Sequence, residues 1–201
     1  MVGDGSREMP IGFSVLKAAQ VIAFLVLEQG GKADMIKTVK LAYMSDRKFL
    51  DDFNRPILND DLYCLDHGPI DSFTLNLIKG KASKEDIDVW KQFLNPVDKA
   101  TWKFTTVSKN MYLGELSDAE EDVMRRIVRR FKDLGPFELV DWIHSHCREW
   151  SNPRGTSTLL SYGDVLKALG KINIENKLRK IDRARRLRED LIKGSFEENA
   201  A

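Results

Sequence analysis

Two short clusters in the sequence combine histidine, cysteine and acidic side chains, the residue types that bind transition-metal ions. These clusters are His144, His146 and Cys147, and Cys64, Asp66 and His67. On a helix, positions 144 and 146 point about 200° apart, so the two histidines cannot hold one ion together. His144 and Cys147 can converge, but a tetrahedral site would need two further ligands from elsewhere. We therefore expect ordinary packing or hydrogen bonding here, with no metal ion and no other cofactor.

Nucleophilic catalysis and phosphate binding each require a local pattern that this sequence lacks. An activated serine on a strand-to-helix turn would read G-x-S-x-G, which does not occur. Cys147 follows His146 in sequence, but its apolar surroundings would raise the pKa of the thiol. The glycines at 3, 5, 30 and 31 match neither the dinucleotide-binding nor the P-loop pattern. These residues predict a protein that is not an enzyme, and an enzyme that depends on His144 or Cys147 is the alternative.

Composition narrows the class of protein further. The 201 residues include 42% hydrophobic and 31% charged side chains, which fits a globular domain with its own core. The net charge of +1 gives no long-range attraction to nucleic acid or to an anionic membrane. The uncharged run 18–27 is too short to span a bilayer, and residues 1–10 lack the pattern of a secretory signal. Cys64 and Cys147 are far apart, so we expect two buried free thiols in the cytoplasm.

Hydrophobic spacing and capping patterns predict a mainly α-helical, compact domain of about seven helices, a small β-hairpin and a C-terminal basic helix. The seven predicted helices are 12–28, 33–51, 69–80, 83–94, 117–135, 137–147 and 161–170. In the first helix, apolar residues on nearly every side, including Leu16, predict deep burial. In the second, Lys37, Lys40 and Lys48 are expected to face solvent. Pro69 suits the first position of the third helix.

Three other segments have distinct patterns. The segment 52–69 is rich in turn residues and contains at most one short strand, at 62–66. The segment 101–114 is rich in threonine, valine and aromatic residues around 108–110, which predicts a β-hairpin. The segment 173–193 carries eight lysines and arginines beside one apolar face, which predicts an amphipathic basic helix.

The basic C-terminal helix raises the question of a nucleic-acid partner, because its cations could neutralise phosphates. Asp182, Glu189 and Asp190 dilute this charge, and no aromatic residue lies between 173 and 193 to stack on bases. We therefore do not expect a nucleic-acid partner. We interpret the charges as a solvated face, and contact with an acidic protein is the alternative. The candidate contacts would then be Arg183, Arg185, Arg186 and Arg188.

Several motifs occur in a fixed order along the chain. In the first half they occupy residues 40–47, 55–57, 60–61, 67–69 and 72–80. In the second half they occupy residues 116–120, 139–144, 149–150, 152–153, 161–162, 164–166 and 168–169. Together these motifs resemble the Panacea domain, the family of SocA-like antitoxins and phage-associated GepA-like proteins. The resemblance covers residues 12–170, and it departs from the family pattern at Ser45 and in the charged tail.

The resemblance implies a Panacea domain over residues 12–170, and we expect a flexible leader (1–11) before it and a helical extension with a disordered end (171–201) after it. It implies the antitoxin of a type II toxin–antitoxin system, which neutralises a cognate toxin protein by direct binding. Some members instead act as adaptors that deliver a toxin to a protease, so a protease complex is a second possible partner. No membrane partner is implied.

Within the family-like motifs, five residues are candidates for contacting the partner or for ordering loops. They are Asp46, Arg47, Arg55, His67 and Trp150. Each has a purely structural alternative. Asp46 and Arg47 can hold the second helix against the 52–69 loop, and Trp150 can fill the core. Tryptophan and arginine are common in binding hot spots, but also in buried scaffolds.

Overall fold

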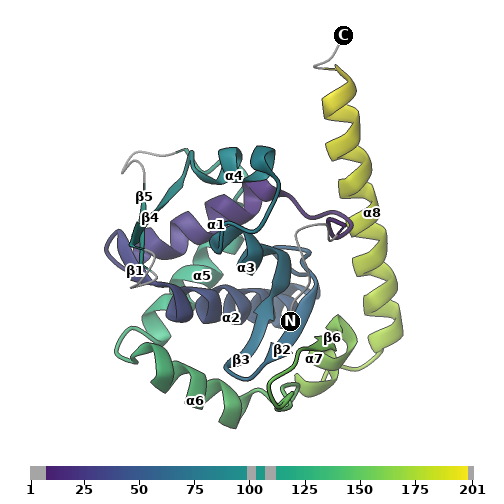
Figure 1. Ribbon diagram of the computed structural model, residues 1–201. Coiled ribbons are helices and arrows are strands. Elements are labelled where there is room, and N and C mark those ends of the chain that lie inside the picture. The colour runs from purple at the N-terminus through teal and green to yellow at the C-terminus, as the bar shows by residue number, and fades with distance from the viewer. Residues whose placement is uncertain (1–7, 99–102, 107–111, 199–201) are drawn as a thin grey trace.

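The computed structural model describes residues 8–98, 103–106 and 112–198, in which eight helices pack with two small sheets (Figure 1). The helices are α1 (Val15–Glu28), α2 (Met35–Phe53), α3 (Ser72–Ile78), α4 (Lys84–Trp90), α5 (Asp118–Arg130), α6 (Pro136–His146), α7 (Tyr162–Ala168) and α8 (Ile174–Glu198). The strands are β1 (Lys32–Asp34), β2 (Leu62–Leu65), β3 (Gly68–Asp71), β4 (Leu94–Asp98), β5 (Lys103–Thr106) and β6 (Thr158–Leu160). The predicted mainly α-helical fold with a small hairpin is confirmed.

Helices α1 and α2 form the centre of the molecule, and the other elements pack around them (Figure 1). Helix α1 contacts α2, α4 and α5, so nearly every side of it is covered. This explains its apolar sequence, although Leu16 is 37% exposed and the expectation of its burial is wrong. Helix α2 contacts α1, α5, α6 and β3, and it positions most of the candidate residues.

Local capping explains where the helices begin. The Ser14 hydroxyl accepts a hydrogen bond from the backbone N–H of Lys17 at the start of α1. The predicted capping boxes of α5 (Ser117 with Glu120) and α7 (Ser161 with Asp164) are both present. Because each cap lies within four residues of the helix it starts, this part of the fold follows from the local sequence.

The two sheets are each antiparallel and three-stranded, with strand orders β1-β5-β4 and β3-β2-β6. The first contacts α1 through β1 and β5, and the second contacts α2 through β3. In the second sheet, β2 pairs with β3 through a tight turn and with β6, so that Tyr63 lies opposite Ile70 on one side and Leu159 on the other. Strand β6 thereby brings the 148–158 loop against the motif-rich segment 62–71.

Several element boundaries differ from the predicted ones, and α5 ends at Arg130 rather than at 135. Pro69 lies within β3 rather than at the start of α3, which begins at Ser72. Helix α4 ends at Trp90, because the chain from Leu94 onward pairs as β4 with β5. The hairpin is therefore formed by β4 and β5, with its first strand before the predicted segment. The predicted turn at 108–110 lies outside the described residues.

Helix α8 runs along one side of the molecule, and its C-terminal end extends beyond the other elements (Figure 1). It packs on α7, and Ile181 is its buried anchor at 2% exposure. The predicted C-terminal helix is confirmed, while residues 1–7 and 199–201, at the ends of the leader and the tail, lie outside the described residues. No helix in the described ranges is long and apolar enough to cross a membrane.

Candidate functional site

Asp46 connects α2 to the turn-rich loop that follows it. Its side chain is 2% exposed, and Oδ1 accepts hydrogen bonds from the backbone N–H groups of Ile57 (2.5 Å) and Leu58 (2.9 Å). Its other oxygen, Oδ2, is buried and accepts no hydrogen bond from the described residues. Burial raises the pKa of Asp46 to about 7, although the two backbone hydrogen bonds oppose this effect. Asp46 thus orders the loop from inside the protein.

A second buried carboxylate, Asp60, caps α3 from outside that helix. Its oxygens accept hydrogen bonds from the backbone N–H groups of Phe73 (2.9 Å) and Thr74 (2.8 Å), in the first turn of α3. The Tyr162 hydroxyl of α7 donates to the Asp60 carbonyl oxygen at 2.9 Å. Burial raises the pKa of Asp60 to about 6. Asp60 therefore joins the loop to α3 and α7.

Lys40 and Asp71 add a basic and an acidic side chain to this buried polar network. Lys40 is 2% exposed, and its Nζ donates to the Pro69 carbonyl oxygen at 2.9 Å, so the prediction that it faces solvent is wrong. Burial lowers the pKa of Lys40 to about 7, and the charge of Asp71 partly offsets this. Burial, followed by the charges of Asp46 and Asp60, holds the pKa of Asp71 well above its usual value. The polar motif residues therefore meet in the interior rather than on the surface.

Arg47 and Glu149 form a buried ion pair between α2 and the loop after α6. Arg47 Nε lies 2.6 Å from Glu149 Oε1, and a terminal guanidinium nitrogen lies 3.3 Å from Oε2, so the contact is bidentate. The side chains are 16% and 0% exposed, respectively. The Tyr43 hydroxyl donates a third hydrogen bond to Glu149 at 2.7 Å. Arg47 thereby fixes the segment that also carries Trp150.

Trp150 and the two histidines of α6 form separate stacked pairs. Trp150 stacks on His144 with ring centroids 3.7 Å apart, and its indole N–H donates to the Leu65 carbonyl oxygen at 2.9 Å. His146 instead stacks on Trp142, 4.2 Å away. The two histidines thus have different neighbours, as the helical spacing predicts. In the described ranges, no three histidine, cysteine or acidic side chains are grouped as metal ligands.

Arg55 and His67 are the two exposed members of the predicted set. The Arg55 guanidinium lies 5.3 Å from the centroid of the Phe49 ring, at the end of α2. His67 occupies the turn between β2 and β3 and meets the Phe137 ring edge-on at 5.9 Å. The structure therefore does not bring the five predicted residues together at one surface site. Asp46, Arg47 and Trp150 contact neighbouring loops and strands, whereas Arg55 and His67 are available to a partner.

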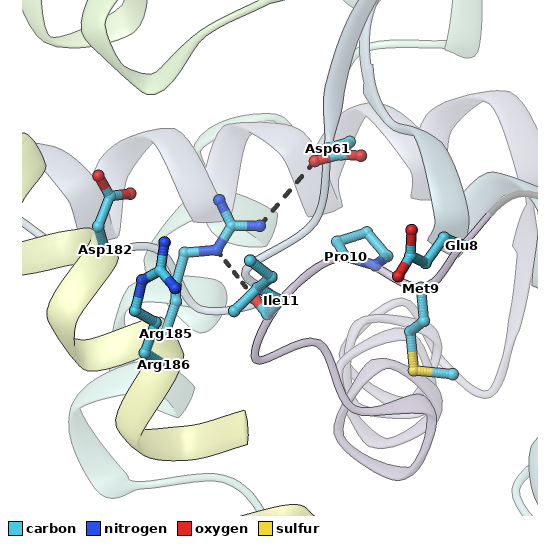
Figure 2. A pocket seen from close by; sticks show the side chains of 8 residues that line it. All are labelled: Glu8, Met9, Pro10, Ile11, Asp61, Asp182, Arg185 and Arg186. Carbon is cyan, nitrogen blue, oxygen red and sulfur yellow. Dashed lines mark hydrogen bonds and ion pairs between the residues drawn. The ribbon is translucent and has the colours of Figure 1, made fainter. Parts of the chain in front are cut away.

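The four candidate arginines of α8 also divide into two that contact the rest of the protein and two that are exposed. Figure 2 shows Arg185 directed toward the leader and the 59–61 loop, where it donates to the Ile11 carbonyl oxygen and lies 3.9 Å from Asp61. Arg188 pairs with Glu115 at 3.0 Å. Both residues therefore hold α8 against the body. Arg183 and Arg186 are exposed, and Arg186 lines the open pocket of about 500 Å³ in Figure 2.

The sequence reading missed one further buried pair, Lys17 with Glu120, whose charged atoms lie 2.6 Å apart. The same Glu120 side chain closes the capping box of α5 by accepting from the Ser117 N–H, so it links α1 to the start of α5. Its place in the capping box was visible in the sequence. Its contact with Lys17, 103 positions away, had no local signal.

The two cysteines are free and buried, as predicted. Cys147 is 2% exposed and its Sγ lies 3.8 Å from the Met44 sulfur. Burial, reinforced by the charge of Glu149, raises the pKa of the Cys147 thiol to about 12. The thiol is therefore protonated at neutral pH, which is the opposite of what a catalytic nucleophile needs.

Cys147 should consequently stay unmodified when the native protein is treated with iodoacetamide at pH 8, because the thiolate is the reacting species. Peptide mapping by mass spectrometry would measure the modified fraction. After unfolding in guanidinium chloride, the same cysteine should be modified fully. Rapid labelling of Cys147 in the native protein would contradict the burial described above and would revive the alternative of cysteine catalysis.

Comparison with known proteins places these features in one family. The family model described as "Antitoxin SocA-like, Panacea domain" matches residues 39–151, which is more than half of the chain. The match includes the Lys40–Asp46–Asp60–Asp71 network and both residues of the Arg47–Glu149 pair. Neither the curated proteins nor the solved structures yield a match. The family-model match confirms the resemblance seen in the sequence motifs, and the chain belongs to the family of SocA-like antitoxins that carry the Panacea domain.

Proposed function

We propose that this protein is the antitoxin of a type II toxin–antitoxin system and that it neutralises a cognate toxin protein by direct binding in the cytoplasm. The observation that carries the proposal is the match to the SocA-like antitoxin family over residues 39–151. The structure supports a role in binding, because the motif residues Asp46, Asp60 and Arg47 stabilise loops and helix ends. A surface presented by such a preordered scaffold loses little conformational entropy when it binds a partner.

The direct test is co-expression with the product of the adjacent gene. We expect that gene product to arrest growth when expressed alone and growth to be restored when this protein is present. The two purified proteins should elute together in gel filtration. A toxic neighbour that this protein neither binds nor neutralises would contradict the proposal.

Two comparisons separate the alternatives. If the protein acts as an adaptor for proteolysis, rescue should be accompanied by loss of the toxin and should disappear in a strain that lacks the protease. If it blocks the toxin by binding, toxin levels should remain unchanged during rescue. A folded Cys147→Ala variant should rescue as well as the wild type, because the proposal gives this buried thiol no chemical role. Loss of rescue in that variant would favour the enzyme alternative.

A further inference from the structure

A mainly apolar groove lies between α8 and the loop after α2, and we name it the α8 groove. Its volume is about 300 Å³, and its lining combines apolar residues, among them Ile57, Ile181, Leu187 and Leu191, with the buried Lys17–Glu120 pair. Leu187 and Leu191 are 55% and 75% exposed, and because they lie one helical turn apart they form a continuous apolar stripe. Helix α8 does not need them to pack on the body, because Ile181, Arg185 and Arg188 provide that contact.

Basic side chains flank this groove. At 100° per residue, Lys180 and Arg183 lie on the same side of α8 as Leu187. Both are exposed, and neither forms an ion pair with any side chain that the structure describes. Arg55, also exposed, lines the opposite wall. An apolar stripe between unpaired cations is complementary to a surface in which leucine-like residues alternate with carboxylates.

The distribution of charge argues against two other occupants. Residues 174–193 contain eight basic and four acidic residues, a net charge of +4 in a chain whose total is +1. A second copy of α8 in the groove would therefore place like charges together. For nucleic acid, the two exposed leucines would be buried against a polar backbone, and no aromatic residue in this segment can stack on bases.

We propose that the α8 groove holds an acidic amphipathic helix of a partner protein, with apolar side chains between Leu187 and Leu191 and carboxylates facing Lys180, Arg183 and Arg55. Spacing of i, i+3, i+4 and i+7 on the partner helix matches the stripe on α8. The proposal rests on the proposed function, because it names the partner as the cognate toxin. The groove would therefore recognise an acidic, leucine-rich helix of the toxin.

The test compares the affinity of purified full-length variants for the toxin by isothermal titration calorimetry. Leu187→Ala with Leu191→Ala should weaken binding about tenfold or more, since exposed apolar anchors dominate such interfaces. Lys180→Glu with Arg183→Glu should weaken it to a similar extent and reduce its dependence on salt. All of these side chains are exposed, so melting curves should match that of the wild type.

Two matched controls keep the comparison specific. Arg129→Glu with Arg179→Glu makes the same change in net charge at two exposed residues outside the groove, and Ile172→Ala truncates a 76% exposed apolar residue that does not line the groove. Both should bind the toxin as the wild type does. Equal losses in the control and groove variants would overturn the proposal, because a general charge or surface effect would then explain them.

Failure of the groove can be told from failure of the proposed function. If the wild type neutralises the toxin and both groove variants bind it unchanged, the groove proposal alone is overturned. If the wild type does not bind the toxin at all, the proposed function fails. A synthetic peptide of about 20 residues with leucine and glutamate at the stated spacing then tests the groove by itself. The groove variants should bind this peptide more weakly than the wild type does, and the control variants should not. Equal binding of the peptide to all variants would overturn the groove proposal.

The same variants also test the two other possible occupants of the groove, nucleic acid and a second copy of the chain. Loss of duplex DNA binding in Lys180→Glu with Arg183→Glu, with toxin affinity unchanged, would assign the basic face to nucleic acid and overturn the proposal. A change from dimer to monomer in Leu187→Ala with Leu191→Ala, again with toxin affinity unchanged, would assign the groove to a second copy of the chain.

Discussion

Replacing Arg47 with alanine should lower the free energy of unfolding by about 3–5 kcal/mol, because it leaves the Glu149 carboxylate buried without its cation. The Glu149 side chain is 0% exposed, and it would keep the hydrogen bond from the Tyr43 hydroxyl but lose its ion pair. Urea denaturation at pH 7 would measure the loss. Arg55→Ala is the matched control, since Arg55 is exposed and its guanidinium lies over the Phe49 ring without a buried ion pair. That change should cost less than about 1 kcal/mol.

This comparison also decides between the two roles considered for Arg47. If Arg47 positions the 147–150 segment, the alanine variant should lose stability, and toxin binding should fall only as far as the folded fraction falls. A variant that keeps wild-type stability but no longer binds the toxin would show instead that Arg47 contacts the partner directly. Glu149→Gln combined with Arg47→Ala should recover part of the lost stability, because no buried charge then remains in the pair.

The free energy of unfolding of the Asp46→Asn variant, measured relative to that of the wild type, should be higher at pH 8 than at pH 4. Burial raises the pKa of Asp46 from 3.8 to about 7, so the folded state binds a proton that the unfolded state has lost. The contribution of Asp46 to stability therefore falls as the pH rises from about 4 to 7. At about 1.4 kcal/mol for each pKa unit, the difference between wild type and variant should change by roughly 4 kcal/mol over this range.

The geometry suits this substitution. Asparagine keeps the Oδ1 atom that accepts from the Ile57 and Leu58 N–H groups, and it removes the charge whose other oxygen has no partner among the described residues. Removing the charge also relieves its repulsion on Asp71, an effect of the same sign. Urea unfolding at several pH values would measure the difference. The exposed control Asp88→Asn should follow the wild type, and an Asp46→Asn variant that did the same would contradict the raised pKa.

Local sequence patterns predicted most of the helices and their start sites. Capping boxes at Ser117 and Ser161 and the apolar pattern of α1 act within one or two helical turns, so they can be recognised without knowing what packs around them. The family motifs were recognised for a related reason, since they are short strings in a fixed order. The short strands β1 and β6 were missed, because three-residue strands depend on partners that are distant in the chain.

The environments of the charged residues, in contrast, depend on long-range packing. Lys40 looked like a solvent-facing lysine of α2, yet β3 covers it and gives it the Pro69 carbonyl as a partner. Arg47 meets Glu149 from 102 positions away, and Arg185 meets Ile11 from 174 positions away. Burial and pairing depend on which distant segments come together, and the spacing of residues along a helix does not contain that information. The sequence therefore determined the helices and the family, whereas long-range packing decided which motif residues are buried and which remain available to a partner.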